Sequence, residues 1–180
     1  MHPTLAVEEL RVIVQRHEPA VPNIRMNIMP LREGYDSRMA EYRGGCHCGV
    51  LKIIYRTDID PARWPLRHDG CSFCRRHGVA ATSDPSGEIA IEIDDVSRVR
   101  RYRFAQRTAE FLLCGECGVF VAALADTASG ARGVINARVL DGVALDFNAV
   151  TAVHFDDESP AQRTERRSRN WTPVTAGISP

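Results

Sequence analysis

The sequence predicts an all-β fold, mainly antiparallel, with an N-terminal helical extension. Short apolar runs of strand length fill the middle of the chain, and residues 89–93 alternate apolar and polar side chains as a half-buried strand does. Turn signals such as Asp-Pro-Ser-Gly at 84–87 and Asp-Gly at 141–142 separate these runs. Many short strands with little helix favour antiparallel pairing. The predicted strands cover residues 50–56, 79–83, 88–93, 99–104, 108–113, 119–125 and 133–139.

Composition divides the chain into an extension (1–43), a β domain (44–156) and a polar C-terminal tail (157–180). In the extension, Thr4 is placed to cap a helix over roughly residues 5–17, which Pro19 and Pro22 would end. We expect the extension to pack against the domain or against a neighbouring chain, which makes a homodimer reasonable. The tail is typical of a solvated loop, although its arginines at 163, 166, 167 and 169 also suit an anion.

The charge balance argues against binding to nucleic acid or to a membrane surface. Lys and Arg together number 23, as do Asp and Glu, so the formal net charge is zero. The sequence has no apolar run of about 20 residues, which a spanning helix needs, and no signal peptide is visible at its start. We therefore expect a cytoplasmic protein with reduced thiols, in which six cysteines point to metal binding or catalysis.

The cysteines form three close pairs: Cys46 with Cys48, Cys71 with Cys74, and Cys114 with Cys117. A C-x-C or C-x-x-C turn places two thiolates on one side of a tight loop, and two such turns supply the tetrahedral ligands of a structural zinc ion. The first and third pairs are both followed by glycine and adjoin predicted strands. We therefore predict one structural Zn²⁺ held by Cys46, Cys48, Cys114 and Cys117.

The middle pair lies in a more polar setting, after Asp69 and before Arg75 and Arg76, which suits a reactive thiolate. Other interpretations of the six cysteines stay open at this point. They could be scattered buried thiols, a disulfide framework, or a zinc site that joins the first pair to the middle pair. Cys71 and Cys74 could also form a redox switch.

Five motifs together resemble the glutathione-dependent formaldehyde-activating enzyme family, which includes centromere-protein-V-like proteins. They are Gly-Gly-Cys-His-Cys-Gly-Val at 44–50, Cys-Ser-Phe-Cys-Arg-Arg-His-Gly at 71–78, Cys114 to Gly118, Val-Ile-Asn-Ala-Arg-Val-Leu-Asp-Gly at 134–142, and Val-His-Phe-Asp at 153–156 with Asn170-Trp171. The resemblance covers roughly residues 43–172. It implies an Mss4-like fold of zinc-stapled β-sheets, with the first and third cysteine pairs on the structural zinc.

The resemblance also implies a second zinc in a C-x-C-x-x-C cluster, and a carbon–sulfur lyase reaction on a thiol–aldehyde adduct such as S-hydroxymethylglutathione. Here Asp69 replaces the first cysteine of that cluster, and carboxylate is a harder ligand for zinc than thiolate. The expected catalytic and second-site residues are therefore Asp69, Cys71 and Cys74. Arg75 and Arg76 are expected to bind a carboxylate of a small thiol substrate such as glutathione.

The competing interpretation is a non-catalytic zinc-stapled β module that binds a protein or a small ligand and keeps a degenerate second metal site. Fold alone does not decide between the enzyme and the module. Metal with an open coordination position at the middle cluster would favour the enzyme, and an empty cluster would favour the module.

Overall fold

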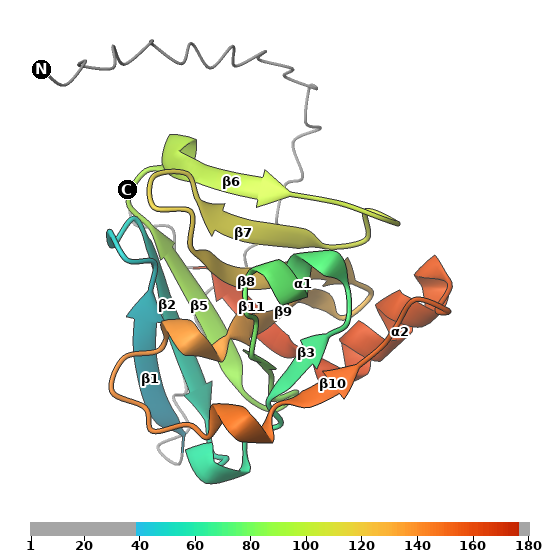
Figure 1. Cartoon of the computed structure of the whole chain (residues 1–180), viewed down its shortest axis with the longest axis horizontal. Helices are drawn as coiled ribbons and strands as arrows, with labels where there is room; N and C mark the ends of the chain where they lie inside the picture. The colour runs from blue at the N-terminus through green and yellow to red at the C-terminus, as the bar shows by residue number, and fades with distance from the viewer. Residues whose placement is uncertain (1–38, 177–180) are drawn as a thin grey trace, which may run out of the picture.

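A sheet of eleven strands dominates the computed structural model, which describes residues 39–176 (Figure 1). Its strands are β1 (Ala40–Gly45), β2 (Leu51–Thr57), β3 (Arg67–Asp69), β4 (Ala81–Thr82), β5 (Glu88–Ile93), β6 (Val99–Tyr102), β7 (Glu110–Cys114), β8 (Phe120–Thr127), β9 (Gly130–Asn136), β10 (Thr151–Val153) and β11 (Thr172–Ala176). Two α-helices accompany them, α1 (Ser72–Arg76) and α2 (Pro160–Asn170). The prediction of an all-β fold is confirmed.

The strands follow the order β1-β2-β5-β11-β9-β4-β3-β10, and β9 also begins a branch through β8 and β7 to β6. Pairing is antiparallel except between β11 and β5 and between β10 and β3, which run parallel. The β11–β5 pair arises because the chain returns from α2 into the middle of the sheet. The mainly antiparallel arrangement therefore follows from neighbouring hairpins, as expected for short connections.

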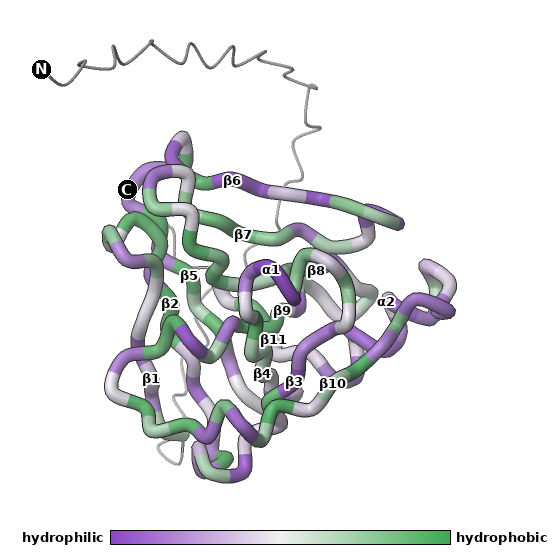
Figure 2. The backbone as a smooth tube through the Cα atoms, in the orientation of Figure 1, coloured by the Kyte–Doolittle hydropathy of each residue, from purple (hydrophilic) through white to green (hydrophobic). Residues whose placement is uncertain are grey.

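Alternating burial explains why the central strands form where they do. In β2, Leu51, Ile53 and Tyr55 are fully buried or nearly so, whereas Lys52 between them is exposed. The residues of β8 from 120 to 125 are all buried, as in a strand covered on both faces. Strands β2, β5 and β8 consist largely of hydrophobic residues, whereas β6 is largely hydrophilic (Figure 2). The core therefore lies where β2, β5 and the β8–β9 hairpin meet.

The solvated loop expected after residue 156 is wrong, because this segment forms α2 and β11. Ser159 begins α2 with a capping box shared with Gln162, and Pro160 occupies the first helical turn. Helix α2 lies beside β8 and β9. Thr172, at the start of β11, is completely buried, and β11 pairs with both β5 and β9. The segment is thus a part of the sheet.

The helix predicted near residues 5–17 lies outside the described residues. The two α-helices in residues 39–176 are both too short to cross a membrane.

Candidate functional site

Two turns bring four cysteines together at one end of the sheet. Cys46 and Cys48 lie in the turn between β1 and β2, and Cys114 and Cys117 lie at the end of β7 and in the turn before β8. The Sγ atoms of Cys46 and Cys48 are 3.7 Å apart, and those of Cys48 and Cys114 are 3.4 Å apart. All four sulfurs lie within 4.8 Å of one another, so this group could hold a metal ion.

Each of the two turns is closed by a hydrogen bond from a glycine. Gly49 donates its N–H to the carbonyl of Cys46 at 3.1 Å, and Gly118 donates to the carbonyl of Cys114 at 3.0 Å. Both glycines have positive φ angles, 80° and 74°, which a glycine adopts without strain. The N–H of Leu51 also donates to Cys46 Sγ at 3.2 Å. Each turn therefore directs its pair of sulfurs to the same point, as the glycines in the sequence predicted.

The close packing of the four thiols gives Cys48 and Cys117 different pKa values. The N–H of Val50 favours the Cys48 thiolate, but contacts with the neighbouring thiols, above all that of Cys114, raise the pKa of Cys48 to about 11. Burial opposes ionisation of Cys117, yet the N–H groups of Val119 and Cys48 lower the pKa of Cys117 to about 6. Sulfurs this close cannot all ionise alike without a neighbouring cation.

The alternatives that would separate the first and third cysteine pairs are not observed. All six cysteines are free, so no disulfide framework forms. Within residues 39–176, the four-cysteine group is the one set of three or more closely spaced metal-ligating side chains. Asp69, Cys71 and Cys74 do not form a second such set.

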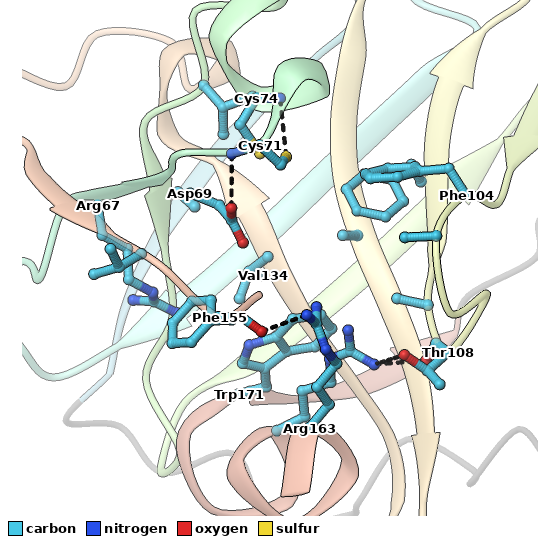
Figure 3. A pocket seen from close by; sticks show the side chains of 18 of the residues that line it. Arg67, Asp69, Cys71, Cys74, Phe104, Thr108, Val134, Phe155, Arg163 and Trp171 are labelled. Carbon is cyan, nitrogen blue, oxygen red and sulfur yellow. Dashed lines mark hydrogen bonds between the residues drawn. The ribbon is translucent and has the colours of Figure 1, made fainter. Parts of the chain in front are cut away.

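The middle cysteine pair lies elsewhere, at a cavity of about 150 Å³. Asp69 at the end of β3, Cys71 just before α1 and Cys74 in α1 line one side of it. Arg163 of α2 and Trp171 line the other side (Figure 3). An aromatic and aliphatic wall joins the two sides. Its members include Phe104, Phe111, Phe120, Ala123 and Val134.

Local hydrogen bonds fix Asp69 and Cys71. An Asp69 carboxylate oxygen accepts the N–H of Cys71 at 2.9 Å, and Cys71 Sγ in turn accepts the N–H of Cys74 at 3.4 Å. This makes Cys71 the N-cap of α1. Burial, assisted by the nearby Cys71, raises the pKa of the Cys74 thiol, which is therefore protonated at neutral pH. Cys71 is the more exposed of the two thiols.

The arginines at the cavity are not the pair that the sequence indicated. Arg75 and Arg76 are exposed on α1 and do not line the cavity. Their position follows from the short helix, whose buried side carries Cys74. The basic side chains that line the cavity come from β3 and α2; they are Arg67, Arg163, Arg166 and Arg167. The sequence did contain a signal for two of these arginines, the capping box at Ser159. A helix that starts there places residues 163 and 167 on one face.

Comparison with known proteins gives little further guidance. No family model matches the chain, and no curated protein matches it. A crystal structure of a Rhodobacter sphaeroides protein, solved as a structural-genomics target, aligns at 25% identity over 62% of this chain and 99% of that one. Its TM-score of 0.44 leaves the functional assignment to the residues themselves.

Proposed function

We propose that this chain is a zinc-binding β protein that acts as a carbon–sulfur lyase on a thiol–carbonyl adduct. One observation carries the proposal: the six cysteines separate into a closely packed group of four and a pair that lines a cavity. The first group suits a structural ion, and the second suits chemistry on a small molecule. The resemblance to the formaldehyde-activating family points in the same direction for both groups.

Zinc is the metal that best suits the four-cysteine group. Soft thiolates select zinc over magnesium or calcium, and four of them give the closed tetrahedral site typical of structural zinc. Tetrahedral Zn–S bonds of about 2.3 Å separate the sulfurs by about 3.8 Å. The sulfur distances of 3.4 and 3.7 Å are close to that spacing. An ion here would join the β1–β2 turn to the β7–β8 turn and so stabilise the sheet.

At the cavity, we assign the reaction to Asp69 and Cys71. In a hemithioacetal, the carboxylate of Asp69 takes the hydroxyl proton as the carbonyl forms and the carbon–sulfur bond breaks. The sulfur leaves with the bonding electrons and receives the proton of the Cys71 thiol. Asp69 then returns its proton to Cys71, so the products are one thiol and one aldehyde with no change in oxidation state. The backbone N–H of Cys74 donates to Cys71 Sγ and so orients the Cys71 thiol.

Asp69, which stands where the resembled family has a cysteine, supports a second candidate function. The Asp69 carboxylate is engaged by the Cys71 N–H, and it does not join the two thiols in a three-ligand metal set among the described residues. That observation favours a non-catalytic zinc-stapled module with a degenerate second site. Metal content and turnover separate the two candidates.

We expect purified protein to contain one zinc ion per chain, held by the four-cysteine group. Plasma emission spectrometry, normalised to protein by amino-acid analysis, gives the ratio. Replacing Cys71 and Cys74 together by serine should leave that ratio at one, because neither thiol belongs to the group of four. A ratio of two that falls to one in this double variant would show instead that the middle pair binds metal.

We expect Cys71→Ser to lower the turnover of S-hydroxymethylglutathione by about 100-fold or more, the usual size of a lost acid–base group. NMR exchange between ¹³C-formaldehyde and its glutathione adduct measures the rate, and thermal melting reports on folding. Ser72→Ala is the matched control, because Ser72 is the exposed neighbour on the same helix. Full activity in a folded Cys71→Ser protein would refute the lyase and leave the non-catalytic module.

A further inference from the structure

Positive charge without a matching carboxylate collects at one end of the cavity. Arg163 and Arg167 are four residues apart on α2, so they lie on one helix face, and Arg67 approaches from β3. Arg166 differs from them, because it is paired with Glu158 at 2.8 Å and lies over the Phe155 ring. Within residues 39–176, Arg67, Arg163 and Arg167 form no ion pair with any carboxylate. Arg163 donates to the carbonyls of Glu158 and Phe155, and Arg67 donates to the carbonyl of Pro65 and the hydroxyl of Ser83. These neutral acceptors leave the two positive charges unneutralised.

Arg167 gives the most direct indication of an anion-binding position. Only 6% of the residue is exposed, and its Nη1 donates to the carbonyl and the hydroxyl of Thr108 at 2.7 and 2.8 Å. Its Nε is buried, and no described residue accepts its hydrogen. Burial and the charges of Arg166 and Arg163 lower the pKa of Arg167 to about 10. A bound anion would satisfy the free donor and offset the buried charge.

The remainder of the cavity defines the rest of the ligand. Phe104, Phe111, Phe120 and Trp171 give it a largely apolar wall. Its volume is about 150 Å³, and an engineered cavity of about that size in another protein holds one benzene molecule. Asp69 at the thiol end would repel a second negative charge on the ligand. Asp156 also lines the cavity, but it is exposed, so water screens its charge. The ligand should be one ring or a short chain with a single anionic end.

We propose that Arg163 and Arg167, supported by Arg67, bind the carboxylate of a small monocarboxylate whose apolar body lies against the aromatic wall. The opposite end of that molecule faces Cys71 and Asp69. Resting on the proposed lyase function, this assigns the carbonyl component of the substrate to the class of small aldehydes that carry one carboxylate. Formaldehyde has neither a carboxylate nor an apolar body, so its glutathione adduct tests the reaction at Cys71 and Asp69 but not this subsite.

Paired ligands of the same shape test the subsite in the unmodified protein. Benzoate and benzamide differ in charge but not in size, and isothermal titration calorimetry of the full chain at pH 7 compares their affinities. We expect benzoate to bind at least 10-fold more tightly, and its affinity to fall as salt is added. Equal affinities for the two ligands, or no binding of benzoate up to 10 mM (roughly the −2.7 kcal/mol limit of useful binding), would overturn the proposal.

Arginine-to-methionine substitutions then show which positive charges bind the carboxylate. Arg167→Met and Arg163→Met should each weaken benzoate binding at least 10-fold and leave benzamide unchanged. Arg169→Met is the matched control, because Arg169 is an exposed residue of the same helix and loses the same charge without lining the cavity. Benzoate binding of wild-type strength in folded Arg167→Met and Arg163→Met, or an equal loss in Arg169→Met, would contradict the assignment. The comparison of benzoate with benzamide remains decisive if a variant unfolds.

The subsite and the lyase can fail separately. Selective benzoate binding without any lyase turnover would keep the subsite and remove the proposed reaction. Turnover without benzoate selectivity would keep the reaction and remove the subsite.

Discussion

Replacing Cys117 by serine is expected to abolish cooperative folding of the β domain at room temperature. Structural zinc in small domains contributes about 10–16 kcal/mol of binding free energy, which is also folding free energy. A domain of ordinary stability has only about 5–15 kcal/mol in total. Because Cys117 belongs to the four-cysteine group that joins the β1–β2 turn to the β7–β8 turn, its loss removes both a ligand and this connection. Circular dichroism during heating, with zinc analysis of the same sample, measures the effect.

Cys74→Ser is the control for this change, because Cys74 is more buried than Cys117 but lies outside the group of four. It should keep one zinc per chain and a cooperative transition. A strong chelator added to the wild-type protein should reproduce the unfolding of Cys117→Ser, and added zinc should reverse it. A Cys117→Ser protein that melts cooperatively within a few degrees of the wild type would show that the sheet does not depend on the ion.

The elements predicted correctly from sequence are those whose local pattern and tertiary burial agree. In β2 and β5 large apolar residues recur at every second position, so the local sequence pattern indicates the strands. These residues are Leu51, Ile53 and Tyr55 in β2 and Ile89, Ile91 and Ile93 in β5. Segment β11 lacks that pattern: Thr172 and Pro173 begin it, and Thr172 is buried because β9 packs beside it. Helix α2 has no apolar stripe, and its one buried residue is Arg167. Their places in the fold depend on long-range pairing, which single-sequence propensity does not contain.

The residues of the candidate site also differ in how well the sequence predicted them. The four-cysteine group was predictable because each turn carries its own glycine and spacing signal, whatever the distance between the turns. Asp69, Cys71 and Cys74 were predictable as neighbours in sequence. The arginines of the tail suggested an anion, but their place beside the cavity was not predictable, because Arg163 and Arg167 come to it only when the chain folds back as α2. Adjacency suggested Arg75 and Arg76 instead, but one short helical turn directs both of them to solvent.

Replacing Gly44 by alanine is expected to be the most damaging glycine-to-alanine change within residues 39–176. An added Cβ would lie 2.0 Å from the carbonyl oxygen of Val139 and 2.7 Å from the Cα of Leu140. Both are backbone atoms, so no side-chain rotation relieves the overlap. Strand β1 would have to separate from the Leu140 turn, with which Gly44 forms an isolated β-bridge. Overpacking by a methyl group ordinarily costs about 1–3 kcal/mol, and we expect at least the upper value here.

Gly130→Ala separates this steric effect from the general preference for glycine at strained backbone angles. Gly130 has a φ of 96°, but an added Cβ there would meet no atom within 4 Å. Its substitution should therefore cost only about 1–2 kcal/mol, the ordinary penalty for left-handed backbone. Urea unfolding of both variants measures the difference. Since Gly44 lies two residues before Cys46, its variant should also lose zinc to a chelator faster than Gly130→Ala does. Equal stability and equal zinc release in the two variants would mean that β1 and the Leu140 turn do not pack this closely, and that the four-cysteine group is positioned without Gly44.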